Sequence, residues 1–250
     1  MFQDHFSVES IIHTLKSRFP RMVGIVKRVG IVQRAHNHLR KKHALRIRFR
    51  HIYETNYWGD AESRSGEGSS LIQTAVIRAE IPQWLADLHV KSFLDIPCGD
   101  HYWMSKIKLP VEQYVGADIV PDLITRNAAR YGCPGKNFVI CDLTKDRLPR
   151  VECIFCRDCL DHLSISDMFK ALRNIQRSGS TYFITTVHTD RTENEDIESG
   201  DWRPTNLMLP PFNFPRPLKL INEQCTEKGG LWADKSLALW RIADLPAVEG

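Results

Sequence analysis

The stretch SFLDIPCGD, residues 92–100, decides the fold. Its apolar first half is typical of a buried strand that ends in a carboxylate, Asp95, and the residues after it form a tight turn. In doubly wound sheets, ligands bind outside the carboxyl ends of the strands, so this turn is predicted to lie at a binding site. Gly99 would let a ligand approach the backbone closely there.

Strand-like and helix-like runs alternate on both sides of this turn, which predicts an α/β fold with a mostly parallel sheet. A helical run is expected from Leu71 to about Leu88, with Ser69 or Ser70 as its N-cap. Two apolar runs near the C-terminus, separated by Gly229 and Gly230, indicate an antiparallel hairpin at the sheet edge. The other expected elements are strands at 113–119, 137–141, 151–156 and 180–187, helices at 101–108, 121–132 and 164–179, and hairpin strands at 219–225 and 236–243.

Two further carboxylates follow predicted strands. Asp118 ends the YVGAD run, 23 residues after Asp95, where a carboxylate can accept hydrogen bonds from both hydroxyls of a ribose. Asp142 follows the next strand, in FVICDL, where it could meet an adenine amino group. Because parallel strands end at one edge of the sheet, the three carboxylates are predicted to converge on one nucleoside.

These residues resemble the class I S-adenosylmethionine-dependent methyltransferases over roughly residues 92–188. More narrowly, nearly everything after Tyr53 is similar to a family of bacterial methyltransferases often associated with glycan and polysaccharide biosynthesis. That similarity rests on the motifs NYWG, SRSGEGSS, LDIPCGD, CRDCLDHLS, DWRPTNL, PPFNFP and DKSLALW. The usual acidic-x-Gly-x-Gly-x-Gly loop is altered, since Pro97 and His101 replace its first and third glycines.

The resemblance implies a Rossmann-like, doubly wound, mostly parallel seven-stranded sheet and S-adenosylmethionine as cofactor. It assigns the methionyl part to the turn of Pro97, Cys98, Gly99 and Asp100, the ribose to Asp118, and the adenine to Asp142 with Leu143. It sets Arg157 and Asp158 beside the methyl group. The Gly-rich SGEGS turn could offer backbone N–H groups to the methionyl carboxylate, with Trp58, Ser65 and Gly68 near the pocket, or it could be a flexible entrance to a capped helix.

Methyl transfer to a sugar hydroxyl is helped by a base, because the hydroxyl is a weak acid. His162 and His188 are the candidates, each following a predicted strand, and each is alternatively a packed or orienting histidine. Asp158 could act directly or orient a histidine. Trp202, Phe212 and Phe214 could present flat faces to a sugar ring, or pack in the core.

The leading hypothesis is therefore methyl transfer to a small acceptor, a hydroxyl of a saccharide or a saccharide-linked molecule. An RNA methyltransferase that uses a basic arm and a non-catalytic cofactor-binding module are the alternatives. A dehydrogenase is disfavoured because no GxGxxG follows the first strand. A metal site at Cys153, Cys156 and Cys159 is disfavoured because no second Cys/His pair accompanies them.

Charge divides the chain unevenly. Residues 1–50 carry twelve Lys or Arg against Asp4 and Glu9, whereas the whole chain has a net charge of only +4. We expect a basic helical extension at 1–52, followed by the methyltransferase domain at 53–250. The extension could contact an anionic membrane surface or an acidic partner, and nucleic acid is a less favoured partner. Without a signal peptide or a long apolar run, a cytoplasmic protein, peripheral at the membrane or free of it, is expected.

Overall fold

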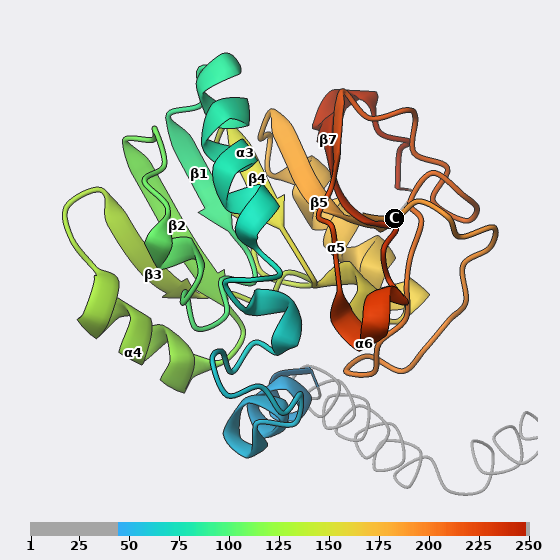
Figure 1. The fold of residues 1–250 in the computed structure, drawn as a ribbon. Coiled ribbons are helices and arrows are strands. Elements are labelled where there is room, and N and C mark those ends of the chain that lie inside the picture. The colour runs from blue at the N-terminus through green and yellow to red at the C-terminus, as the bar shows by residue number, and fades with distance from the viewer. Residues whose placement is uncertain (1–44, 249–250) are drawn as a thin grey trace, which may run out of the picture. The chain divides into compact units, whose positions relative to one another are not determined.

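The computed structural model describes residues 45–248, and a seven-stranded sheet forms the centre of the compact unit that begins at Arg46 (Figure 1). The strand order is β3-β2-β1-β4-β5-β7-β6. Strands β1 to β5 are parallel, while β7 runs antiparallel to both β5 and β6. The predicted doubly wound sheet with an antiparallel edge hairpin is confirmed. The strands are β1 (Ser92–Asp95), β2 (Gln113–Asp118), β3 (Lys136–Ile140), β4 (Cys153–Cys156), β5 (Tyr182–His188), β6 (Lys219–Asn222) and β7 (Lys235–Arg241).

The central strands are apolar on both faces. Every residue of β4 (CIFC) is buried, as are three of the four residues of β1. Phe93 pairs with Cys153 and Leu94 with Ile154, so large side chains of β1 and β4 point to the same two faces. Strands covered on both sides read in this way as continuous apolar runs.

The α-helices that follow residue 70 are α3 (Ala75–Asp87), α4 (Pro121–Tyr131), α5 (Ile165–Arg177) and the short α6 (Glu227–Gly230). α4 begins with proline at its first position, and the Ser164 side chain caps α5 by accepting the Asp167 N–H. The expected start of α3 was wrong. The Ser70 hydroxyl accepts the Gln73 N–H in a preceding turn, so the helix begins only at Ala75.

A second expectation was also wrong, the helix at 101–108. Only a 3-10 helix, Met104–Lys106, forms there. His101 has a left-handed φ of 57°, which stops a regular helix at its first residue, and Pro110 follows closely. Trp103 and Met104 instead bury their side chains in the core.

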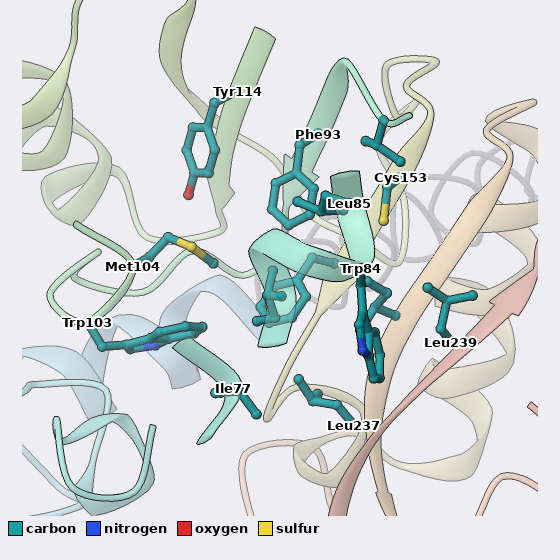
Figure 2. Close-up of a cluster of buried hydrophobic side chains, with 14 residues drawn as sticks. Ile77, Trp84, Leu85, Phe93, Trp103, Met104, Tyr114, Cys153, Leu237 and Leu239 are labelled. Atoms are coloured by element: carbon teal, nitrogen blue, oxygen red, sulfur yellow. The ribbon is translucent and has the colours of Figure 1, made fainter. Parts of the chain in front are cut away.

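The main core lies between α3 and the sheet. Figure 2 shows Ile77, Trp84 and Leu85 of α3 packed with Phe93 of β1 and Leu237 of β7. The cluster therefore joins the parallel half of the sheet to the antiparallel hairpin. This packing fixes the carboxyl edge of the sheet relative to the segment that precedes α3.

Most of the predicted basic extension, at 1–44, lies outside the described residues. A helix runs through residues 46–55, and Ile52 within it is 1% exposed. Among residues 45–248, none of the helices combines the length and apolar character that a membrane crossing requires.

Candidate functional site

The strand order reverses between β1 and β4. From β1 the chain proceeds to β2 and β3 on one side of the sheet, and from β4 it proceeds to β5 on the other. Ligands of open α/β sheets bind outside the carboxyl ends of the strands at such a point. Asp95 ends β1, Asp118 ends β2, and Arg157 with Asp158 directly follows β4. These predicted residues therefore come to one edge of the sheet.

Asp95 and Asp118 are buried carboxylates at the ends of two neighbouring strands. Burial raises the pKa of Asp95 to about 7, and the charge of Asp118 adds to the rise. The Tyr114 hydroxyl donates a hydrogen bond to Asp95, which opposes that rise. Burial likewise raises the pKa of Asp118 to about 6. Two such acids at neighbouring strand ends are typical of a functional site, since folding alone does not favour them.

Asp118 ties β2 to the turn after β1. One of its oxygens accepts the Gly99 N–H at 3.2 Å, and the other accepts the Val120 N–H at 3.0 Å. A carboxylate has about four acceptor positions, so these two bonds leave capacity for a ligand. The position predicted for the ribose contact is thus backbone-anchored and still able to accept.

Asp142 is differently placed. One oxygen accepts both the N–H and the hydroxyl of Thr144, and the other forms an ion pair with Lys145 at 3.1 Å. The carboxylate therefore closes the turn after β3, and an adenine amino group would compete with these donors. Leu143 is buried, and its carbonyl accepts a hydrogen bond from Asn174. The adenine contact of Asp142 and Leu143 remains a prediction.

The backbone of the turn Pro97 to Asp100 lies at the site, but the Cys98 side chain points into the core. The Cys98 side chain packs with Val120, Leu123 and Ile124 of the α4 region, and its N–H donates to Ala117. Burial raises the pKa of this thiol well above its ordinary value, so Cys98 is an inert core residue. Gly99 has a left-handed φ of 52°.

A segment that we call the cap, residues 63–68, lies against this turn. The Asp100 carboxylate accepts the Ser63 hydroxyl at 3.0 and 3.1 Å and the Arg64 N–H at 2.9 Å. The Ser65 hydroxyl accepts the Asp100 N–H at 3.2 Å. A Cβ on Gly99 would lie 2.2 Å from the Ser65 hydroxyl oxygen, so only glycine permits this contact. Ser65 thus contacts the turn, and its predicted place near the cofactor pocket stays a prediction.

The other end of the cap rests on a group that we call the ion-pair cluster: Arg157, Asp158, Glu223, Glu227 and Lys235. The Arg157 guanidinium donates to the Gly68 carbonyl at 2.8 Å, and a Cβ on Gly68 would lie 3.1 Å from both Asp158 and Lys235. The same guanidinium reaches Glu223 at 2.6 Å. Gly68 and Arg157 are thus brought together, with Arg157 holding the cap.

Asp158 is held as an anion within the cluster. Burial alone would raise its pKa, but Arg157 at 2.9 Å and Lys235 at 2.8 Å hold that pKa well below its usual range. A carboxylate this acidic is a weak proton acceptor. The geometry favours Asp158 as an anchor of the cluster over a base.

The two candidate histidines differ in their surroundings. The His162 Nδ1 lies 2.9 Å from the Asp201 carbonyl oxygen, and the Trp58 ring packs on the imidazole with 4.9 Å between centroids. A carbonyl only accepts, so Nδ1 carries the proton and Nε2 of the neutral ring keeps its lone pair. His188 ends β5, is 1% exposed, and neither ring nitrogen has a hydrogen-bond partner among the described residues.

Sequence reasoning missed Glu223 and Lys235, which lie in the C-terminal hairpin and are 2% and 6% exposed. The available signal was charged residues within the otherwise apolar runs of that hairpin.

Phe212 and Phe214, expected as a sugar platform or as core, are core: Phe212 packs on Phe169 and Phe214 on Trp240. Among residues 45–248 no group of three His, Cys, Asp or Glu side chains is arranged to hold a metal ion.

No protein-family model matches the sequence, and a search of curated proteins found no match. Among solved structures, the chain is similar to the N-methyltransferase NodS of Bradyrhizobium japonicum WM9 in complex with S-adenosyl-L-homocysteine. The TM-score is 0.56 and the identity 14%, over 78% of this chain and 99% of NodS.

Two further structures are similar over parts of the chain. Human N-acetylserotonin methyltransferase with S-adenosylmethionine gives a TM-score of 0.44 at 15% identity, over 61% of this chain and 47% of that one. CalS10, an amino pentose methyltransferase of Micromonospora echinaspora, gives 0.38 at 15% identity, over 45% and 48%. This chain thus spans about half of each. At 14% identity, the similarity to NodS shows that the chain has a Rossmann-like methyltransferase fold.

Proposed function

We propose that this chain binds S-adenosylmethionine and transfers its methyl group to a hydroxyl of a saccharide or a saccharide-linked molecule. The observation that carries the first part is the hydrogen bond from the Gly99 N–H to the Asp118 carboxylate, beside the point where the strand order reverses. A buried carboxylate there suits the two hydroxyls of a ribose. NodS, which shares the fold, was crystallised with S-adenosyl-L-homocysteine.

The residues present fit this cofactor. A Cβ at Gly99 would lie 2.2 Å from the Ser65 hydroxyl oxygen, and a Cβ at Gly68 would lie 3.1 Å from Asp158 and Lys235. The two glycines therefore let the turn pack closely on the cap, and the cap on the ion-pair cluster. Each carboxylate of the cluster faces a cation, because Arg157 and Lys235 pair with Asp158, Glu223 and Glu227. The cap and the turn can therefore hold a zwitterionic methionyl group by backbone and hydroxyl groups.

The bound cofactor supplies an electrophilic methyl group on a sulfonium. The chain's residues then have to align the acceptor, exclude water and take up a proton. His162 suits the last task, because its Nε2 keeps a lone pair while the Asp201 carbonyl fixes the ring. The cap, held by Asp100 at one end and Arg157 at the other, suits the exclusion of water.

The acceptor class is supported by the sequence resemblance to methyltransferases of glycan biosynthesis and by aromatic side chains after β5. Trp202 and Trp232 are both partly exposed, unlike the buried Phe212 and Phe214. Partly exposed indole faces can pack on the apolar face of a sugar ring.

Calorimetric titration of the full chain with S-adenosyl-L-homocysteine tests the cofactor. Asp118→Ala is expected to lower the affinity roughly tenfold or more, because one charge-assisted hydrogen bond contributes about 1.5–3 kcal/mol. Asp122→Ala, an exposed carboxylate in the first turn of α4, is the matched control and should bind as the unmodified chain does. No binding by the unmodified chain, or equal binding by Asp118→Ala, would refute the proposal.

A further inference from the structure

Four buried polar atoms at the carboxyl end of β5 have no hydrogen-bond partner among residues 45–248. They are the two ring nitrogens of His188, Oδ1 of Asp161 and the hydroxyl of Thr205. The residues are 1%, 3% and 2% exposed, respectively. Buried polar atoms in native proteins are nearly always paired, so several unpaired ones in one place point to a ligand that pairs them.

Direct contacts join these residues into one group, which we call the His188 chamber. The backbone N–H of His188 donates to the backbone carbonyl of Thr205 at 2.8 Å, which sets the two residues side by side. The Trp202 ring meets the His188 ring edge to face at 5.8 Å. The same indole donates to Oδ2 of Asp161 at 2.9 Å, so Oδ1 is the oxygen left over. One chain of contacts thus runs from Asp161 to Thr205.

Two indole rings form a wall of the chamber. Trp202 and Trp232 lie 4.6 Å apart at 64°, and Trp232 meets His188 edge to face at 6.1 Å. Trp232 follows Gly229 and Gly230, which have left-handed φ values, and a Cβ at either glycine would meet no atom within 4 Å. This part of the wall therefore follows a segment that is not packed at its glycines.

A cavity of about 420 Å³ meets the wall at Arg191, and its lining residues are Asp190, Arg191, Thr192, Glu193, Glu195, Arg203 and Pro204. Arg191 of this lining lies over the Trp232 ring at 6.0 Å and 3.6 Å from an Asp234 oxygen. The other oxygen of Asp234 is 3.5 Å from Nδ1 of His188. The volume falls in the range of small-molecule sites.

We infer that the His188 chamber binds a hydroxyl-bearing ring, the saccharide acceptor, with its hydroxyls on His188, Thr205 and Asp161. Hydroxyl groups both donate and accept, which matches one carboxylate oxygen, one hydroxyl and Nε2 of the imidazole, while Nδ1 faces Asp234 at 3.5 Å. The indole faces suit the apolar C–H face of a sugar ring. The inference rests on the proposed function, and it deepens that function by naming the acceptor's site.

The test uses the full chain saturated with S-adenosyl-L-homocysteine. The probes are the methyl glycosides of glucose, galactose, mannose and N-acetylglucosamine, followed by tryptophan fluorescence and by the imidazole NMR signal that His188→Gln removes. At least one glycoside is expected to shift that signal. Thr205→Val should weaken its binding roughly tenfold, and Thr205→Ser, which keeps the hydroxyl, should restore it.

Thermal unfolding separates a binding role from a structural one. Because the Thr205 hydroxyl has no partner in the described chain, Thr205→Val should not lower the melting temperature. Thr185→Val is the matched control, because it removes a buried hydroxyl that donates to Cys156 at 2.7 Å and should lower the melting temperature. If Thr205→Val fails to fold, Asp161→Asn replaces it, since the amide can still accept from Trp202.

The inference is overturned if none of the four glycosides binds the loaded protein, or if the variants bind them as the unmodified chain does. A folded Thr205→Val protein whose melting temperature falls as far as that of Thr185→Val also overturns it. Failure to bind S-adenosyl-L-homocysteine is a different result, seen before any glycoside is added, and it counts against the proposed function.

Discussion

At the residue scale, Asp95 is a carboxyl group buried at the candidate site, where its charged form is disfavoured. It is 3% exposed, close to Asp118, and bonded to Tyr114, whose hydroxyl oxygen also lies 3.1 Å from Nδ1 of the buried His101. Burial disfavours the charged form of a carboxyl group, and at Asp95 it outweighs the opposing charges of Arg157 and Lys136. The folded chain therefore keeps a proton on Asp95 over a wider pH range than the unfolded chain does.

The pH dependence of stability tests this. The pKa of Asp95 is about 7 in the folded chain against an ordinary 3.8, so the folded chain binds more protons between these values. The contribution of Asp95 to stability is then full below about pH 4 and is lost as the pH rises through about 7. Asp95→Asn cannot lose a proton, so urea unfolding should show the variant gaining stability relative to the unmodified chain from pH 4 to 8. A difference independent of pH would contradict the assigned burial.

His162 gives a second prediction at this scale. His162→Gln should lower the rate of S-adenosyl-L-homocysteine formation with the acceptor by about 10²–10⁴, the usual contribution of a general base. Cofactor affinity, measured by calorimetry, should stay within the error of the unmodified chain. His51→Gln, on an exposed histidine, is the control. Unchanged turnover in His162→Gln would assign the imidazole to packing against Trp58.

Residue types and spacing predicted the strand-end acids but not their partners. Asp118 follows an apolar strand, and this position alone placed it at the sheet edge. The roles of Asp158 and Cys98 depend on tertiary contacts, with Lys235 from β7 and with the α4 cluster. Nothing within a few residues of either indicates those contacts, so sequence reasoning could not assign them.

At the scale of elements, the cap is held between the turn after β1 and the C-terminal hairpin. Its Ser63–Ser65 end bonds to Asp100, and its Gly68 end bonds to Arg157, which Glu223 neutralises. The hairpin therefore completes the site although it lies at the far side of the sheet. An element predicted only to close the sheet edge also positions a loop before α3.

Glu223→Gln tests this arrangement. Loss of one buried carboxylate leaves Arg157 undercompensated, and breaking a buried pair typically costs about 3–5 kcal/mol. We expect lower stability, faster amide hydrogen exchange in residues 65–70, and weaker binding of S-adenosyl-L-homocysteine. Lys219→Met, in β6 of the same hairpin, removes a surface ion pair with Asp87 and a cation–π contact 6.0 Å from the Trp84 ring, and it should leave exchange in residues 65–70 and binding unchanged. Exchange in 65–70 unchanged by Glu223→Gln would contradict the role of the cluster.

Local patterns predicted most elements because each has its own period or cap. α5 buries Met168, Ala171, Leu172 and Ile175, the spacing of one helical face, and Ser164 caps it. The run at 101–108 has comparable helical character, but the left-handed His101 and the burial of Trp103 and Met104 override it. Tertiary packing decides short segments of this kind.

At the scale of the whole molecule, alternation of strands and helices predicted the doubly wound sheet, since few topologies satisfy right-handed crossovers. The sequence also concentrates basic residues in 1–50, and the partner of that stretch stays a prediction. We propose that the basic residues 1–50 contact an anionic membrane surface. The full chain should sediment with phosphatidylserine vesicles, less so at higher salt and less with Arg40, Lys41 and Lys42 changed to Glu. Salt-independent sedimentation would argue against it.

The central claim is that neighbouring strand ends gather their carboxylates around one nucleoside. A crystal structure of the full chain with S-adenosyl-L-homocysteine measures this most directly. We predict the ribose hydroxyls within hydrogen-bond distance of the Asp118 carboxylate, with the amino-acid part between the Pro97–Asp100 turn and the cap. A nucleoside bound elsewhere, with Asp118 and Asp95 facing no part of it, would contradict this claim.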